Sequence, residues 1–160
     1  MQTPIENRNL IKQAPHSPRD RFGGFAILGR TVDKCRASIG RALGEYHYDC
    51  PLDNRLFDFK GITRDQFKIA VISAKDYEDV AAWLEANGIP KTSEEIESWS
   101  DKVEAARVKD IAVRQDPDRR KEMVESCHKL GLNFESATIF EWLEADDEAT
   151  FHPHAQMAAK

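Results

Sequence analysis

Five consecutive residues bring together side chains that can carry out chemistry. They supply two phenols, an imidazole, a carboxylate and a thiol, and they are Tyr46, His47, Tyr48, Asp49 and Cys50. An imidazole has an ordinary pKa of about 6.5, so His47 is the candidate proton carrier at neutral pH. Cys50 is the candidate nucleophile where a nearby cation favours its thiolate. The alternative is structural, with both tyrosines anchoring a loop on the core and Cys50-Pro51 forming a turn.

Four residues before this loop share one face of a helix, because the spacings between them are four, three and four. They are Gly29, Asp33, Arg36 and Gly40. This face adjoins an apolar stripe, so we expect Asp33 and Arg36 to be partly buried. One interpretation is a structural ion pair between them beneath a crossing helix. The other makes Asp33 a catalytic group and Arg36 a cation that holds an acidic ligand.

A second row of cations follows the same predicted helix and consists of Arg30, Lys34 and Arg41. This row lies roughly opposite the apolar stripe. It could bind a carboxylate or a phosphate, or it could be the solvated face of an amphipathic helix. No aromatic residues alternate with these cations, so the row lacks the signature of nucleic-acid binding.

A metal site needs three or four ligands that converge. His47 and Cys50 could supply two of them, with Cys35 or Asp33 as a third. None of these residues has a recognised zinc spacing. We therefore predict no metal site and keep a metalloprotein that uses His47 and Cys50 only as an alternative.

A long helix is predicted to position these residues. Ser17 can cap its free N–H groups, and Pro18 suits the first helical position. Apolar residues then recur at spacings of three and four, and they are Phe25, Leu28, Val32, Cys35, Ile39 and Leu43. Gly44 is the predicted end of the helix, and the loop with the reactive side chains follows it.

The rest of the chain is also predicted to be helical. Asp53 is the expected cap of a short helix, and capping boxes begin at Thr63 and Thr92. Asp76 and Asp116 are the expected caps of two more helices. No segment shows the alternation of a strand.

These elements predict an all-α fold, a compact bundle of six or seven helices. We divide the chain into an extended N-terminal arm (residues 1–16), a single helical domain (residues 17–150) and a frayed tail (residues 151–160). A length of 160 residues suits one such domain.

The charge of the chain argues against nucleic acid as its main partner, because 28 acidic residues outnumber 23 basic ones. The distribution is uneven: residues 1–60 hold 10 Lys and Arg against 7 Asp and Glu, and the remainder holds 13 against 21. An anion-binding surface should therefore involve the first third. Three cysteines without framework spacing, no signal peptide and no membrane-spanning run predict a soluble, cytoplasmic protein.

The chain resembles the bacterial domain-of-unknown-function family DUF 5069. The segments that carry the likeness are Ser17–Arg19, Gly23-Gly24, Arg30–Ala37, Leu43–Tyr46 and Cys50–Asp53. The likeness spans about residues 10–100 and resumes near Phe140–Leu143. It implies a small intracellular bacterial protein, and it brings with it no activity, cofactor or catalytic residue.

The leading hypothesis is a site for a small acidic polar metabolite between the first helix and the Glu45–Asp53 loop. The expected catalytic residues are His47, Tyr46, Cys50 and Asp33, and the expected ligand-binding residues are Arg30, Lys34, Arg36 and Tyr48. The first alternative is a non-catalytic protein-interaction module, which would dock through the basic first helix and the acidic last one. The sequence names no cofactor and no oligomeric state, and it leaves turnover open.

Overall fold

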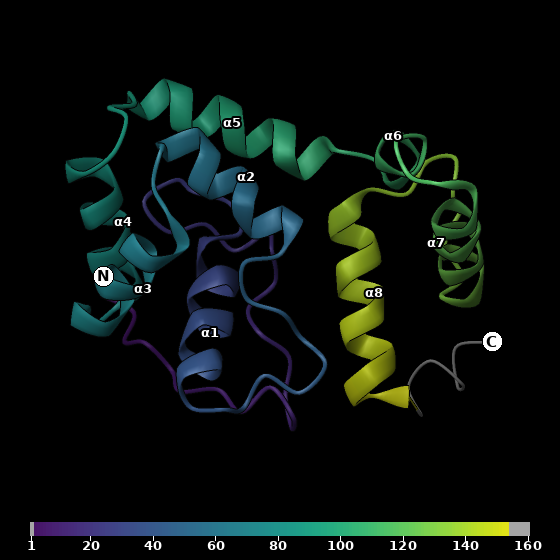
Figure 1. Cartoon of the computed structure of the whole chain (residues 1–160), viewed down its shortest axis with the longest axis horizontal. Coiled ribbons are helices and arrows are strands. Elements are labelled where there is room, and N and C mark those ends of the chain that lie inside the picture. Colours follow the sequence, from purple (N-terminus) through teal and green to yellow (C-terminus); the bar gives the residue numbers. More distant parts are fainter. Residues whose placement is uncertain (1, 154–160) are drawn as a thin grey trace. The chain divides into compact units, whose positions relative to one another are not determined.

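The computed structural model describes residues 2–153, and within this range the chain forms eight α-helices and no β-sheet (Figure 1). The fold is therefore all-α as predicted, with one helix more than the upper number expected. The helices are α1 (Leu28–Ile39), α2 (Pro51–Lys60), α3 (Arg64–Ser73), α4 (Tyr77–Ala86), α5 (Ser93–Ala105), α6 (Val108–Ala112), α7 (Pro117–Lys129) and α8 (Ile139–Phe151).

The chain divides into two compact units, Met1–Ser100 and Asp101–Lys160, and the boundary between them falls inside α5. The single domain over residues 17–150 stays a prediction. Residues 2–16 form no helix, and the extended N-terminal arm also stays a prediction. Most of the predicted frayed tail, residues 154–160, lies outside the described part. No helix in the described part has the length and apolar character needed to cross a lipid bilayer.

The first helix is shorter than predicted at both ends, because it begins at Leu28 and not near Ser17, and it ends at Ile39 and not at Gly44. Gly23 and Gly24 adopt left-handed backbone angles, with φ of 59° and 84°. Glycine enters this region without the steric penalty of a side chain, so the doublet turns the chain before a helix can form. Ile27 is the residue before the helix, and its φ of 61° is also left-handed. The predicted cap at Ser17 is therefore wrong.

Local capping signals give the starts of the later helices correctly. At α3 the backbone N–H of Gln66 donates to the hydroxyl of Thr63, and the backbone N–H of Thr63 donates to the Gln66 side chain. Asp76 and Asp116 cap α4 and α7 through their carboxylates.

At α2 the prediction was wrong by three positions, because Cys50 is the N-cap and Asp53 lies in the first turn. Pro51 occupies the first helical position, which it favours because it has no N–H group to leave unpaired.

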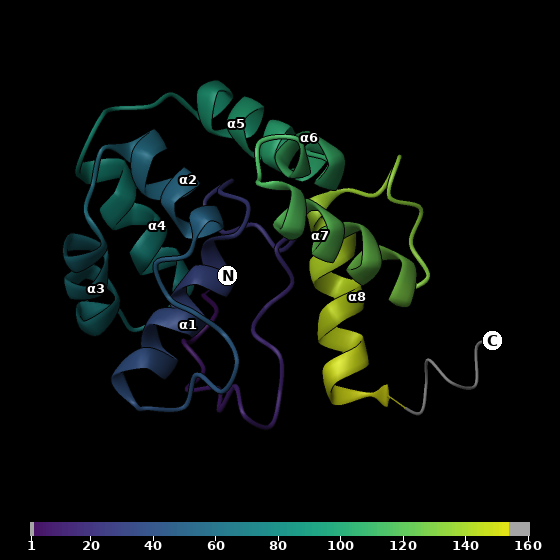
Figure 2. The same cartoon turned by 45° about the vertical axis from the view of Figure 1, so that its right-hand side comes forward.

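In the first unit, α1 contacts α3 and α4, and α3 also contacts α2 and α4 (Figures 1 and 2). Nine of the twelve residues of α1 are buried, and three of them are charged: Arg30, Asp33 and Lys34. The prediction that Arg30 and Lys34 lie on a solvated face is therefore wrong. A helix buried on nearly every side needs polar partners for its charges, and these partners define the candidate site.

In the second unit, α6, α7 and α8 enclose an apolar cluster that includes Val108, Met123, Cys127 and Ile139. Trp142 on α8 donates its indole N–H to the hydroxyl of Ser126 on α7, at 2.8 Å. Cys127 is fully buried here, as expected for a small core residue.

Candidate functional site

Two polar networks start from neighbouring residues of α1. We call them the Asp33 network (Asp33, His16, Tyr77 and Arg8) and the Lys34 network (Lys34, Asp53, Thr31 and Cys50). Successive side chains on an α-helix point about 100° apart. The two networks therefore extend to different sides of the helix and involve different parts of the first unit.

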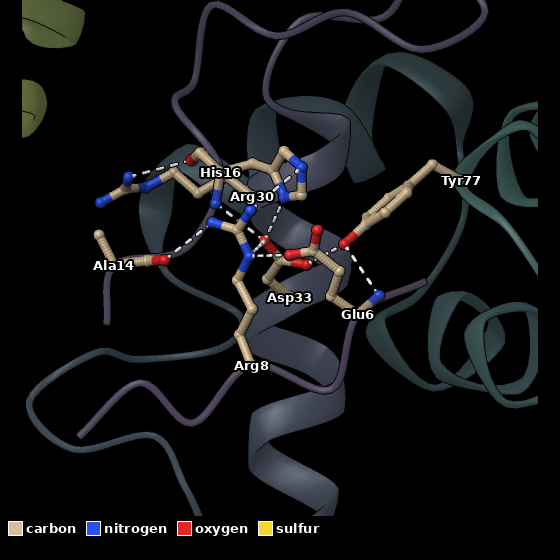
Figure 3. A network of polar contacts seen from close by, with 7 residues as sticks. All are labelled: Glu6, Arg8, Ala14, His16, Arg30, Asp33 and Tyr77. Atoms are coloured by element: carbon tan, nitrogen blue, oxygen red, sulfur yellow. Dashed lines mark hydrogen bonds and ion pairs between the residues drawn. The ribbon is translucent and has the colours of Figure 1, made fainter. Parts of the chain in front are cut away.

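The Asp33 carboxylate is fully buried and accepts hydrogen bonds on both oxygens (Figure 3). Oδ2 lies 2.8 Å from the backbone nitrogen of His16 and 2.6 Å from its Nδ1. Oδ1 lies 2.5 Å from the hydroxyl of Tyr77 on α4. The Nε of Arg8 lies 3.8 Å from Oδ2 and adds positive charge. A buried carboxylate needs this degree of compensation.

The neighbours of Asp33 are themselves held in place. The imidazole of His16 makes edge-on ring contacts with Phe22 and Tyr77, and those two rings stack on each other at 4.7 Å between centroids. Burial, reinforced by the hydrogen bond to Asp33, raises the pKa of Tyr77, so its hydroxyl stays a donor. Arg8 also pairs with Glu6. The N-terminal segment is thus fixed to α1 and α4.

Asp33 does not pair with Arg36, which corrects the ion-pair interpretation. Arg36 is partly buried, and its Nε is a buried nitrogen without a hydrogen-bond partner in the part of the chain described here. Sequence reasoning missed Arg8, His16 and Tyr77 as the partners of Asp33. The one available signal was Tyr77 itself, because a tyrosine at an inward helix position needs a partner for its hydroxyl.

The Lys34 network joins α1 to the start of α2. The ammonium of Lys34 lies 2.9 Å from Oδ1 of Asp53 and donates to Sγ of Cys50 at 3.2 Å. The hydroxyl of Thr31 donates to the same carboxylate oxygen at 2.9 Å. The backbone N–H groups of Asp49 and Cys50 donate to Oδ2 of Asp53. Only 4% of Lys34 and 1% of Asp53 are exposed.

Cys50 is the accessible thiol among the three cysteines. It is partly exposed, whereas Cys35 and Cys127 are fully buried. Burial raises the pKa of Cys35 to about 11 and also raises that of Cys127, so both are poor nucleophiles. The side chain of Cys50 also accepts a hydrogen bond from the backbone N–H of Asp53 in the first turn of α2. A lysine ammonium and the N-terminus of α2 therefore both lie at the Cys50 sulfur.

The loop lies over the α1 face that carries Arg30 and Lys34, which are neighbours at a spacing of four. The guanidinium carbon of Arg30 lies 5.5 Å from the centre of the Tyr46 ring, within the range of a cation–π contact. Arg30 also donates to the backbone oxygen of His16 at 3.3 Å. The cations predicted to receive an anion therefore hold the loop.

Of the other loop residues, Tyr48 packs against the protein and His47 is exposed to solvent. The hydroxyl of Tyr48 donates to the backbone oxygen of Arg64 at 2.7 Å, and its ring contacts Phe57 and Phe67. Burial raises the pKa of Tyr48. Tyr48 therefore fits the anchoring interpretation. His47 is exposed and has no polar or ring partner among the described residues, so the structure does not bring it to Asp33.

Two of the alternatives can be compared with this geometry. An interaction surface on the basic first helix would need exposed cations, but Arg30 and Lys34 are buried, and the exposed Arg41 lies beyond the end of α1 at Ile39. For a metal site, residues 2–153 contain no group of three or more His, Cys, Asp and Glu side chains arranged to hold an ion.

Comparison with known proteins gives one assignment. A search of the curated proteins gives no match. The family model described as a domain of unknown function, DUF5069, matches residues 12–149. This match includes α1, the loop and α2, and it confirms the resemblance drawn from the sequence. The chain therefore belongs to the DUF5069 family.

Proposed function

We propose that the protein binds a small molecule with an acidic group where α1 meets the Glu45–Asp53 loop, and that Cys50 acts on it as a nucleophile. The observation that carries the proposal is the position of the Lys34 ammonium, 3.2 Å from Sγ of a partly exposed cysteine. The setting we propose is a bacterial cytoplasm, where reducing conditions keep such a thiol free.

The charges around Cys50 support both parts of the proposal. The Lys34 ammonium and the N-terminus of α2 place positive charge at the sulfur, so an anion is attracted to the group that is to attack it. Asp53 opposes this attraction, but it also fixes the ammonium at one position. His47, exposed in the same loop, is the proposed proton carrier.

The proposed ligand-binding residues are fewer than the sequence predicted. Tyr48 is kept as an anchor of the loop, because its hydroxyl and its ring are both occupied. Arg36 follows Lys34 by two positions and so faces about 200° away from it on the helix. We therefore propose that the charge of the buried Lys34 ammonium draws the acidic group of the ligand toward Cys50, with Arg30 and Tyr46 shaping the loop beside it.

The test compares two alkylating reagents of similar size, the acidic iodoacetate and the neutral iodoacetamide. The quantity to compare is the rate of alkylation of Cys50 by iodoacetate divided by the rate with iodoacetamide. We expect this ratio to be several times larger in the folded protein than in the urea-denatured chain. Peptide mass spectrometry assigns the label, and the buried Cys35 and Cys127 serve as internal controls. His47→Gln should leave this preference unchanged and slow only a step that transfers a proton.

Lys34→Met is the matched variant, since it removes the ammonium and keeps most of the side-chain volume. It should abolish the preference for iodoacetate. An equal ratio of the two rates in folded and denatured protein contradicts the proposal. So does a melting temperature that no member of a panel of small carboxylates and phosphates changes.

A further inference from the structure

The contact between Lys34 and Cys50 joins an amine to a thiol across 16 positions of the chain. The ammonium is almost fully buried, and within residues 2–153 its polar partners are Asp53 and Cys50. It therefore stays beside the sulfur instead of moving through solvent as a surface lysine does. Cys50, in contrast, is open enough for a small oxidant to reach it.

We infer that Lys34 and Cys50 form a covalent nitrogen–sulfur bond when the protein meets hydrogen peroxide. The inference stands on the contact between these two side chains and does not depend on the proposed binding of an acidic molecule. It assigns a modification site to the start of α2. The bond would tie the end of the loop to α1.

The first step oxidises sulfur. The Cys50 thiolate attacks one oxygen of hydrogen peroxide, the O–O bond breaks, and the products are a sulfenic acid and hydroxide. Sulfur is oxidised and peroxide is reduced. The Lys34 ammonium lies 3.2 Å from the sulfur that makes this attack.

The second step forms the bond. The Lys34 ammonium gives a proton to the Asp53 carboxylate, 2.9 Å away, and the hydroxide from the first step later takes that proton. The free amine attacks the Cys50 sulfur, the S–O bond breaks, and the leaving hydroxide takes a second amine proton to become water. One peroxide thus yields one nitrogen–sulfur bond and two waters, and the chain loses two hydrogen atoms.

Condensation competes with further oxidation to a sulfinic acid, and the geometry favours condensation. A sulfenic acid with a nearby nucleophile reacts with it before a second peroxide arrives. Lys34 is that nucleophile, and Asp53 is its base. The other two thiols, which could attack the sulfenic acid to form a disulfide, belong to Cys35 and Cys127, and both are fully buried.

The experiment treats the full-length, reduced protein with hydrogen peroxide and maps its peptides without a reducing agent. We expect a linked pair of peptides, lighter than their sum by two hydrogen atoms, and loss of tryptic cleavage after Lys34. Dithiothreitol should restore both peptides. Mapping at the peptide level separates this change from oxidation of methionine.

Lys34→Arg is the decisive variant, because it keeps the cation beside Cys50 but replaces the amine with a weakly nucleophilic guanidinium. It should accumulate a sulfenic acid that dimedone captures, with no linked peptide. Circular dichroism and the melting temperature report whether this variant folds. Cys50→Ser should give neither product.

Labelling of the wild-type protein keeps the test independent of any variant. Dimedone capture at Cys50 without a linked peptide, or a disulfide between two chains through Cys50, overturns the inference. A linked peptide that also forms in denatured protein overturns it too, because the bond would then owe nothing to the fold. Loss of the iodoacetate preference leaves the linkage intact, so the two proposals fail separately.

Discussion

The two networks of α1 begin at adjacent residues and differ in what they leave exposed. The Asp33 carboxylate meets donors from the N-terminal segment and from α4, and both of its oxygens are satisfied inside the protein. The Lys34 ammonium meets a carboxylate and a thiol, and that thiol is partly exposed. We propose that burial of charge serves structure in the first network and reactivity in the second.

The difference follows from the chemistry of the last group in each network. The Asp33 network ends in Tyr77, whose raised pKa keeps it a protonated donor, and in Arg8, which is already paired with Glu6. Neither is a nucleophile at neutral pH. The Lys34 network ends in Cys50, which is a nucleophile as soon as it loses its proton. Four predictions test this division.

Asp33→Asn should have the largest effect on stability. The amide cannot carry the negative charge that compensates Arg8. Its NH₂ group would also point at one of the hydrogen-bond donors that now donate to the carboxylate, and two donors repel each other. We expect the free energy of unfolding to fall by about 3 kcal/mol, which is typical when one partner of a buried charge pair is removed. Urea denaturation followed by circular dichroism measures it.

Because the two networks are separate, Asp33→Asn should not change the reactivity of Cys50. The rate of alkylation of Cys50 by iodoacetamide, measured well below the urea midpoint, should equal that of the wild type. A large change in this rate would show that the two networks are coupled, which contradicts the separation of a structural network from a reactive one.

Asp53→Asn should affect both stability and reactivity. Asp53 accepts hydrogen bonds from Thr31 and from two backbone N–H groups in addition to its ion pair, so we expect a loss of about 2 kcal/mol. With the carboxylate gone, the Lys34 ammonium has the Cys50 sulfur as its remaining partner. Alkylation of Cys50 should therefore become several times faster, and a slower reaction would contradict the role assigned to Asp53.

Local signals in the sequence were sufficient for most helix starts. A cap such as Thr63 or Asp116 acts on backbone N–H groups two or three positions away, so it can be recognised without knowledge of the fold. The start of α1 was missed although the glycine doublet before it is a local signal, because glycine also occurs inside helices. What the sequence cannot show is that Gly23 lies against α4, where a side chain would meet the Cβ of Ala81 at 2.5 Å.

The candidate site was predicted in part for the same reason. The sequence identified Lys34 and Cys50 as chemical groups and placed both at the junction of the first helix and the loop. It did not identify the partners of Asp33, because His16 and Tyr77 lie 17 and 44 positions away. Lys34 was expected either to bind an anion or to lie on a solvated face, since a helical pattern cannot show that a loop will cover its polar face.

Gly29→Ala should disturb the Asp33 network by packing alone. The added methyl group would lie 2.6 Å from Cε2 of Phe22 and 3.3 Å from Cβ of His16, so the rings around Asp33 must move. We expect a loss of about 2 kcal/mol, as for other overpacked cores. Alkylation of Cys50 should stay unchanged.

Gly40→Ala is the matched control on the same predicted helical face. Its nearest neighbour would be the backbone oxygen of Arg36 at 3.7 Å, an ordinary contact, and its φ of −83° suits alanine. We expect a change within about 0.5 kcal/mol. Equal losses for both variants would mean that crowding at Phe22 and His16 does not matter.

Apart from the control variants, Tyr77→Phe should have the smallest effect at neutral pH, and this effect should depend on pH. The variant loses the hydrogen bond to Asp33, which contributes about 1.5 kcal/mol. Burial and the Asp33 carboxylate raise the pKa of Tyr77 in the folded protein above the ordinary value of 10.0. Above that value the unfolded chain loses the phenol proton while the folded protein keeps it, so the tyrosine's contribution to stability falls as pH rises.

The stability advantage of the wild type over Tyr77→Phe should therefore shrink between pH 8 and pH values above about 10. Tyr48→Phe is the control for the size of the effect, because its hydroxyl donates to a neutral backbone oxygen and should contribute less at pH 8, about 0.5 kcal/mol. Burial raises the pKa of Tyr48 as well, so its smaller contribution should fall in the same direction with pH. Urea denaturation at each pH measures both differences. If the stability advantage of Tyr77 is constant across this range, its hydroxyl is not held as a donor to a buried carboxylate. The Asp33 network would then not be the purely structural network that we contrast with the Lys34 network.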